Sequence, residues 1–487
     1  MPTRQGMQKK FVTNLAFLLF LNLLIKPFWI LGIDRAVQNT VGASSYGLYS
    51  ALFNFSFLFN ILLDVGITNF NNRNIAQHNH LLQKHLSGIL VLRLVLSAAY
   101  FIVSFIIAIL LDYQLEELWM LSVMLLNQAL ISFILYLRSN IAGLHLFRID
   151  SLVSVLDRFI MIILCGVLLW GGITNTTFRI EWFIWAQTFA YAITAIFTFL
   201  ILAGRVKKIE FKWDPKFSMV ILKQSYPFAI LILLMTFYNR IDSVMIERIL
   251  DNGAEQAGIY AQAYRLLDSA NMIAYLFSGL LLPMFSHMIK HRKPIEELAE
   301  LSFSFIAVPA IMIIACGVFY AHDLMGLLYL AHVEESATVF AILINCFLAI
   351  SSVYIFGTLL TANGNLKVLN MIAFGGMILN ITMNFILIPM YQAKGAAIAS
   401  MTTQFITAGA QILLAHRIFK FKIRWTLAMR YLIFVFITFC LFYFTSQFNT
   451  WFIWRAGFGA AACFLLALLL KLIRPMELFK VIKYGDN

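Results

Sequence analysis

The chain has 487 residues, of which 61% are hydrophobic and only 12% charged, and its formal net charge is +13. This composition excludes a soluble globular protein and is typical of an integral membrane protein. The basic balance does not imply nucleic acid as a partner, because the placement of the Lys and Arg residues between apolar segments accounts for it.

Fourteen long apolar segments follow one another along the chain. In chain order they cover residues 11–33, 46–68, 87–111, 118–137, 152–172, 181–204, 224–247, 259–288, 298–321, 337–360, 368–390, 395–415, 428–446 and 455–473. Each is long enough to cross ~30 Å of hydrocarbon as a helix of about 20 residues. We therefore predict an all-α protein with about 14 transmembrane helices.

Lys and Arg residues fall almost entirely on every second connection between these segments. If the N-terminus is cytoplasmic, 26 of the 36 Lys and Arg residues lie inside. Outside there are only Arg35, Arg179, Arg248, Lys394 and Arg455. Because basic residues near short loops resist translocation, both termini are predicted to be cytoplasmic. The start MPTRQGMQKK resembles a signal peptide, but the apolar run after it is too long, so we interpret it as an uncleaved first helix.

Sequence patterns of enzymes and metal sites are absent. The chain has no HExxH, GxSxG or GxxxxGK[ST] pattern, and its five cysteines lie in apolar segments without a CxxC pair. His78, His80 and His85 share one loop without a Cys or carboxylate at ligand spacing. We therefore expect no enzyme, no cofactor and no metal site.

An internal recurrence predicts two lobes. GASSYGLY at 42–49 and GAEQAGIY at 253–260 share Gly, Ala, Gly and Tyr at matching positions, and each follows the first helix of a proposed six-helix half. Halves with an even number of helices are parallel repeats, related by an axis along the membrane normal. We predict an N-lobe at 1–204 (helices 1 to 6), a cytoplasmic linker at 205–223, a C-lobe at 224–416 (helices 7 to 12), and helices 13 and 14 with a cytoplasmic tail at 417–487.

Several segments together resemble a transporter family. They are VGASSYGLYSALFNFSFLFNILLDVGIT at 41–68, NRIDSVMIERILDNGAEQAGIYAQAYRLLDSANMI at 239–273, Pro283, and NITMNFILIPMYQAKGAAIA at 380–399. In order and spacing they resemble the polysaccharide-exporter branch of the multidrug/oligosaccharidyl-lipid/polysaccharide (MOP) superfamily, which includes the Wzx-type flippases of lipid-linked oligosaccharides. The resemblance spans nearly the whole chain. It implies a MATE/MOP-like fold and a role in surface polysaccharide or lipopolysaccharide biosynthesis in the bacterial inner membrane. It also implies a lipid-linked oligosaccharide substrate, with membrane lipids and other polysaccharide-assembly proteins as partners.

The last of these segments is read as a helix–turn–helix. Pro389 is expected to end one helix, and Gly395 to permit the tight turn before the next. Asn380 and Asn384 are four residues apart and share a helix face, where they either hydrogen-bond during packing or contact the substrate.

Cations inside the predicted spans are the candidate site, because each costs ~2.5 to 3.5 kcal/mol at a helix centre on insertion scales. At 1.5 Å per residue, Lys26 and Arg240 lie ~10 Å, and Arg265 ~8 Å, below the outer ends of their helices. The three would share one level if helices 1, 7 and 8 are neighbours, which the family resemblance implies. A cavity that ends at this level would hold the diphosphate of the substrate, since Arg binds phosphate oxygens bidentately.

A simpler interpretation stays open for these residues. Long cationic side chains near an interface can snorkel to the headgroups, and this is expected of Arg93 in particular. Arg265 and Asp268, at i and i+3, can neutralise each other. Asp242, Glu247 and Asp268 are candidates for an outer gate or for coupling, the first two by pairing with Arg265.

The family resemblance, together with these cations, implies a flippase that moves a polyprenyl-diphosphate-linked oligosaccharide by alternating access. One alternative is a cation-coupled drug exporter of the same superfamily, which would carry buried carboxylates in its first lobe. Helix 1 instead carries Lys26, and its acid, Asp34, is expected at the outer end. A membrane glycosyltransferase or polymerase is a weaker alternative, because no catalytic carboxylate or sizeable external loop stands out.

Overall fold

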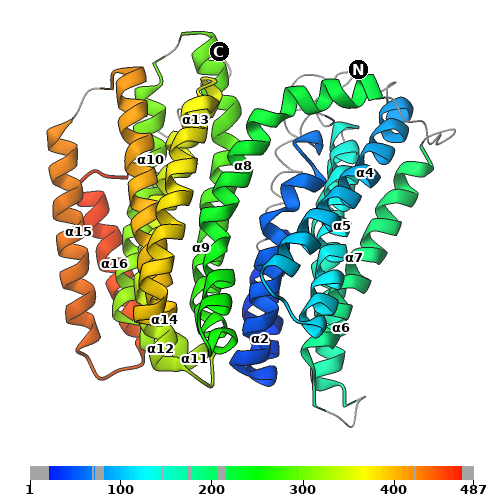
Figure 1. The fold of residues 1–487 in the computed structure, drawn as a ribbon. Helices are drawn as coiled ribbons and strands as arrows, with labels where there is room; N and C mark the ends of the chain where they lie inside the picture. The colour runs from blue at the N-terminus through cyan, green and yellow to red at the C-terminus, as the bar shows by residue number, and fades with distance from the viewer. Residues whose placement is uncertain are drawn as a thin grey trace. The chain divides into compact units, whose positions relative to one another are not determined.

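A computed structural model of the protein describes residues 21–22, 24–68, 71, 82–144, 146–172, 177–205, 215–292, 294–421 and 424–473. All regular structure within these ranges is helical (Figure 1). His78, His80, residues 206–214 of the predicted linker and the first ten residues of the first predicted span lie outside the described ranges. The chain forms two compact units, unit 1 (Met1–Gly258) and unit 2 (Ile259–Asn487).

Unit 1 is built around α5. Its elements are η1 (Trp29–Asp34), α2 (Arg35–Leu58), η2 (Asn60–Leu63), α4 (Leu82–Leu110), α5 (Leu115–Gly143), α6 (Phe147–Trp170), α7 (Ile180–Ala203) and α8 (Pro215–Ile249). α5 packs against α2, α4, α6 and α7, and α2 also packs along α8. The apolar faces of α4, α5 and α7 meet in a cluster that includes Ile89, Leu137 and Leu202, each at most 2% exposed.

Unit 2 contains the remaining helices. They are α9 (Gly253–Lys290, which begins in the last residues of unit 1), α10 (Glu296–Phe319), α11 (Ala321–Leu328), α12 (Val333–Leu343), α13 (Cys346–Ala362), α14 (Leu366–Phe419), α15 (Trp425–Ser446) and α16 (Phe452–Leu469). α13 packs along α14, α10 packs against α13 and α15, and α15 pairs with α16.

Ten helices in the described ranges are long and apolar enough to cross a membrane. This confirms the predicted all-helical, multi-pass membrane protein. The number of fourteen spans and the division into two six-helix lobes remain predictions.

The two recurring motifs contact each other within unit 1. Gly42 turns the chain inside α2 with a φ of +83°, as expected of a glycine turn. A Cβ built on Gly47 would lie 1.7 Å from the carbonyl oxygen of Ala254, and one built on Gly258 would lie 2.1 Å from that of Ala43. The sixth residue of each motif therefore meets the second residue of the other, a reciprocal contact of the kind that two-fold related segments make.

The predicted turn in NITMNFILIPMYQAKGAAIA is present, but its residues act differently from the prediction. α14 continues past Pro389, and the backbone leaves the helical region at Gln392, which has a φ of 53°. Gly395 instead allows a close approach, because a Cβ there would lie 2.1 Å from the carbonyl oxygen of Leu387. Asn380 and Asn384 are fully buried, and the Asn384 amide donates to Asn380 at 3.1 Å, as expected of a packing contact.

Candidate functional site

Lys26 lies on the first helix of unit 1, next to α6. One turn earlier on the same helix, the Asn22 amide donates to the Ser154 hydroxyl of α6 at 3.0 Å. Lys26 itself is half-buried, and the charges that act on it are Arg158 and Arg138, which repel it, and Asp157, which attracts it. Arg138 is paired with Asp150 at 2.8 Å, so Lys26 and Arg158 remain against the single carboxylate of Asp157. This local excess of positive charge favours an anionic ligand.

Arg158 is the site residue that sequence reasoning missed. Its Nη1 donates to the Tyr191 hydroxyl at 3.0 Å, and its guanidinium lies 5.6 Å from the ring centroid of Trp29 and 5.7 Å from that of Tyr191. Aromatic faces attract a cation, so they hold Arg158 in place without neutralising its charge. Asp157, whose carboxylate is 3.8 Å from Nε, is its ion-pair partner. The position of Arg158 inside the predicted span 152–172 was the signal that could have identified it.

Arg240 and Asp242 lie on α8, in the same unit. The Arg240 guanidinium lies 5.5 Å from the ring centroid of Phe57 on α2 and is half-buried, whereas Asp242 is only 1% exposed. α2 and α8 pack along each other, so Arg240 is held at their contact. Lys26 thus lies near charged residues of α5 and α6, and Arg240 contacts Phe57 of α2. The shared depth of the two cations remains a prediction.

Arg265 and Asp268 lie on α9, in unit 2. Both are half-buried, and their i, i+3 spacing places them on one face of the helix. On the same helix, the Tyr260 and Tyr264 rings stack with centroids 5.6 Å apart. Lys26 and Arg240 therefore belong to one unit and Arg265 to the other.

Glu247, the second gate candidate, belongs to an ion network at the end of α8. Arg248 binds both oxygens of the Glu247 carboxylate, one of them from Nε at 2.6 Å, and its Nη2 also donates to Glu117 at 2.8 Å. The Tyr113 hydroxyl donates to Glu247 at 3.4 Å, beneath the Arg248 guanidinium. Burial raises the pKa of Tyr113 above its usual range, and the nearby Glu247 carboxylate adds to this rise, so the phenol remains a donor.

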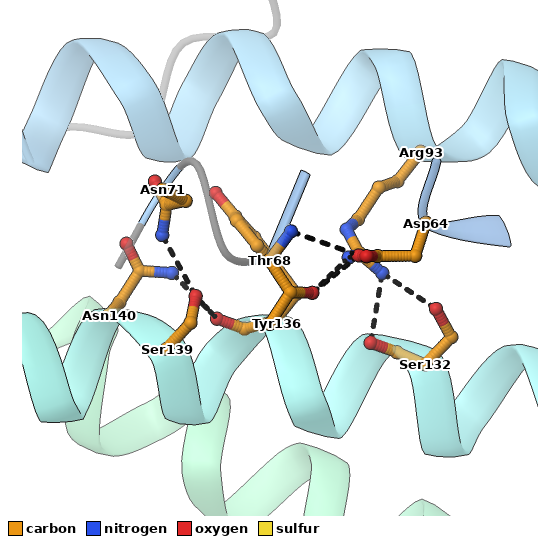
Figure 2. Close-up of polar contacts among 8 residues, drawn as sticks. All are labelled: Asp64, Thr68, Asn71, Arg93, Ser132, Tyr136, Ser139 and Asn140. Carbon is orange, nitrogen blue, oxygen red and sulfur yellow. Dashed lines mark hydrogen bonds and ion pairs between the residues drawn. The ribbon is translucent and has the colours of Figure 1, made fainter. Parts of the chain in front are cut away.

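Arg93 does not snorkel to the headgroups, so that prediction is wrong. It is 5% exposed and points across to α5, where Nη1 donates to the carbonyl and the hydroxyl of Ser132, both at 2.9 Å (Figure 2). Its Nη2 pairs with Asp64 and donates to Thr68 at 2.9 Å, and the guanidinium lies 4.7 Å from the ring centroid of Tyr136.

The partner of Arg93 comes from a break in the chain after η2. Asp64 is followed by Val65 and Gly66, which both have a positive φ, of 44° and 83°, and its carboxylate accepts from the Thr68 N–H at 3.1 Å. This break turns the Asp64 carboxylate toward α4, where Arg93 neutralises it. On the other side of Thr68 and Tyr136 in Figure 2, the Asn71 amide donates to the Ser139 hydroxyl at 3.0 Å.

Asp34 also differs from the prediction. The helix that carries it does not end at residue 33 but continues to the turn at Gly42, so Asp34 is not at the outer end. It is 3% exposed, and the Tyr46 hydroxyl lies 2.9 Å from both of its carboxylate oxygens. Unit 1 therefore contains a buried carboxylate on its first helix.

Metal ligands do not gather in the described ranges, where no three His, Cys, Asp or Glu side chains are close enough to hold a metal ion. What the residues offer instead is positive charge held against aromatic rings, at Arg158 and at Arg240.

A family model described as "Polysaccharide biosynthesis protein" matches residues 12–289, more than half of the chain. The chain belongs to the polysaccharide biosynthesis protein family. No curated protein sequence matches it significantly. The predicted relationship to a polysaccharide biosynthesis family is thereby confirmed, and the protein is a multi-pass membrane protein of that family.

Solved structures of transporters share the fold of this family member. The lipid II flippase MurJ in an inward closed conformation aligns with a TM-score of 0.67 at 15% identity, covering 96% of this chain and 99% of that chain. An inward-facing multidrug resistance MATE family transporter of the MOP superfamily aligns with a TM-score of 0.61 at 14% identity, covering 82% and 98%. A MOP superfamily transporter from Pyrococcus furiosus, whose binding pocket of reverse polarity suggests a different function, aligns with 0.60 at 14%, covering 84% and 95%. The fold is MurJ-like and MATE-like.

Proposed function

We propose that the protein moves a polyprenyl-diphosphate-linked oligosaccharide from the cytoplasmic to the outer leaflet of the bacterial inner membrane. The observation that carries this proposal is a polysaccharide biosynthesis family match on a chain whose fold is similar to that of a lipid II flippase. Transport proteins of this kind need not be enzymes, because the substrate crosses unchanged.

The diphosphate is the part of the substrate that the cations recognise. Lys26, Arg240 and Arg265 bind it. Arg158 contributes to binding beside Lys26, because these two cations with the one carboxylate of Asp157 leave a net positive charge there. The lipid tail stays in the membrane while the two lobes rock about the site, and Asp242, Glu247 and Asp268 serve as gate or coupling groups. The reciprocal contact between the two motifs supports the internal repeat that such rocking requires.

The test uses the purified full chain in proteoliposomes with a fluorescent polyprenyl-diphosphate-linked oligosaccharide, whose outer-leaflet fraction is quenched by dithionite. We expect the wild-type protein to raise the quenched fraction, and Lys26→Ala, Arg158→Ala, Arg240→Ala and Arg265→Ala to reduce the rate about tenfold or more each, because a charge-assisted hydrogen bond is worth ~1.5 to 3 kcal/mol. The matched controls, Arg179→Ala and Lys394→Ala, remove exposed cations and should transport normally. If the wild-type protein does not flip the substrate, the flippase proposal is refuted. If all four variants transport at the full rate, the proposed site is refuted.

A cation-coupled drug exporter is the second candidate, and buried Asp34 favours it. A carboxylate held by the Tyr46 hydroxyl on the first helix is the feature that sequence reasoning required of such an exporter. The two functions differ in one measurement. If a sodium or proton gradient drives efflux of a cationic dye from vesicles, and Asp34→Asn abolishes it, the drug exporter is correct.

A further inference from the structure

The Arg158 side chain is bound on one side and open on the other. It belongs to the candidate membrane span Arg148–Trp170, and 28% of its side chain is exposed. Ser154, one turn earlier on the same face of α6, accepts from Asn22 of the first helix, and Lys26 of that helix lies beside Arg158. The exposed part of the guanidinium therefore faces the first helix and its charge, where a cation within a span needs water or a polar ligand.

The Nη1 end of the guanidinium is held inside unit 1. Nη1 donates to the Tyr191 hydroxyl of α7 at 3.0 Å and contacts the Met161 sulfur at 3.4 Å. Both partners are buried, so a ligand has no access to this end. Because Met161 is on α6 with Arg158 itself, the Tyr191 hydroxyl is the hydrogen-bond partner that fixes the guanidinium to a second helix.

The opposite edge of the guanidinium, formed by Nε and Nη2, is available to a ligand. Nη2 has no hydrogen-bond partner in the part of the chain that the structure describes, and neither nitrogen is enclosed. Asp157 lies 3.8 Å from Nε, which is an ion-pair distance but too long for a hydrogen bond. The Nε–H and one Nη2–H point in the same direction, as the fork that binds two phosphate oxygens.

The helix that carries Tyr191 is itself fixed. One turn before Tyr191, the Gln187 amide donates to the Tyr49 hydroxyl of α2 at 2.7 Å, and both of these residues are buried. α7 also packs along α5 and α6. The Tyr191 hydroxyl therefore has a defined position, and a hydrogen bond to it determines the direction in which the open edge of Arg158 points.

We propose that Tyr191 is a positioning residue, which directs the Nε–Nη2 edge of Arg158 so that this edge binds two oxygens of the substrate's diphosphate. The inference rests on the proposed function for the identity of the ligand. Tyr191 does not touch the ligand and adds no charge. Without its hydroxyl, Arg158 keeps its charge but can rotate about its side-chain bonds, and it then attracts the phosphate no better than the point charge of a lysine does.

A double-mutant cycle on the purified full chain in detergent tests this role, with farnesyl diphosphate as the probe and its Kd as the readout. In the wild-type background, Arg158→Lys keeps the charge but removes the fork, and binding should weaken about tenfold. In the Tyr191→Phe background the fork is no longer directed, so Arg158→Lys should weaken binding further by less than about twofold. Tyr191→Phe keeps the ring beside the guanidinium, so this variant is expected to fold.

Tyr100→Phe is the matched control. Tyr100 is also a fully buried tyrosine of unit 1, and its hydroxyl donates to the Ser56 carbonyl at 2.6 Å. In this background Arg158→Lys should still weaken binding about tenfold, because the loss of a distant buried hydroxyl does not release the fork. An equal effect of Arg158→Lys in the wild-type and Tyr191→Phe backgrounds, or a reduced effect in the control as well, would overturn the inference.

The cycle measures binding without transport, so it separates this inference from the proposed function. If the cycle behaves as expected but the wild-type protein flips no substrate in proteoliposomes, the flippase proposal fails and the role of Tyr191 stands. If flipping occurs but the two changes act independently, the role of Tyr191 fails and the flippase proposal stands. A wild-type protein that does not bind farnesyl diphosphate would also overturn the inference.

Discussion

The Arg248 guanidinium lies face-on over the Tyr113 ring, 3.9 Å from its centroid, and so fastens the end of α8 to the connection between α4 and α5. The same guanidinium separates the carboxylates of Glu247 and Glu117, which would otherwise face each other. One side chain thus makes a cation–π contact and two ion pairs.

Arg248→Ala should destabilise the protein by about 2 to 3 kcal/mol, because it leaves two partly buried carboxylates without a counter-charge. The measurement is thermal unfolding in detergent, followed by the fluorescence of the nine tryptophans. Arg179→Ala, which removes an exposed arginine, is the control, and its melting temperature should equal that of the wild-type protein. Equal melting temperatures for both variants would contradict a role for the network.

Tyr113 predicts a loss of stability at alkaline pH. Its pKa is raised in the folded protein, whereas in the unfolded chain it is about 10. The stability from the neutral phenol is therefore fully present below pH ~10, and is lost as the pH rises from there toward the folded pKa, because the unfolded chain then binds fewer protons. The difference in melting temperature between the wild-type protein and Tyr113→Phe should shrink or reverse from pH 8 to pH 11. A difference that does not change with pH would disprove the assignment.

The membrane orientation predicts which loops react with an impermeant thiol reagent. In a background without the five native cysteines, Gln114→Cys and Asn252→Cys should be labelled in intact cells, and Lys208→Cys only after lysis. Labelling of Lys208→Cys in intact cells would invert the predicted topology.

Arg265→Lys separates a bidentate role from a simple charge. Lysine keeps the positive charge but lacks the planar fork, so transport should fall about tenfold if Arg265 binds two diphosphate oxygens. Lys26→Arg is the reciprocal change, and since Lys26 acts as a point charge its rate should stay near the wild-type value. Equal rates for Arg265→Lys and the wild-type protein would show that charge alone suffices at this position.

The sequence predicted where the helices lie better than it predicted the contacts of the charged residues. Apolar runs of about 20 residues determine a span locally, so the membrane class and the helices follow from composition. Arg93 could not be placed this way, because its partner Asp64 is 29 residues away, behind a break formed by two positive φ angles. Asp34 was misplaced for a related reason, since the turn that ends its helix is at Gly42, beyond the last strongly apolar residues.

The candidate site was predictable only in part. Lys26 was found because it interrupts an apolar run, and by the same criterion Arg158 should have been found as well. The role of its neighbours could not be predicted, because Trp29 and Tyr191 come from two other helices and only the fold brings them around the guanidinium.

The contact between the two glycine motifs is made by main chain against main chain. The contact requires that positions 47 and 258 remain glycine. It places no constraint on the side chains of the motif residues outside the contact. Two copies of an ancestral segment can therefore diverge widely in composition while their backbones still meet. Four differences in eight residues are therefore compatible with the predicted repeat, in which only the two backbones need to match.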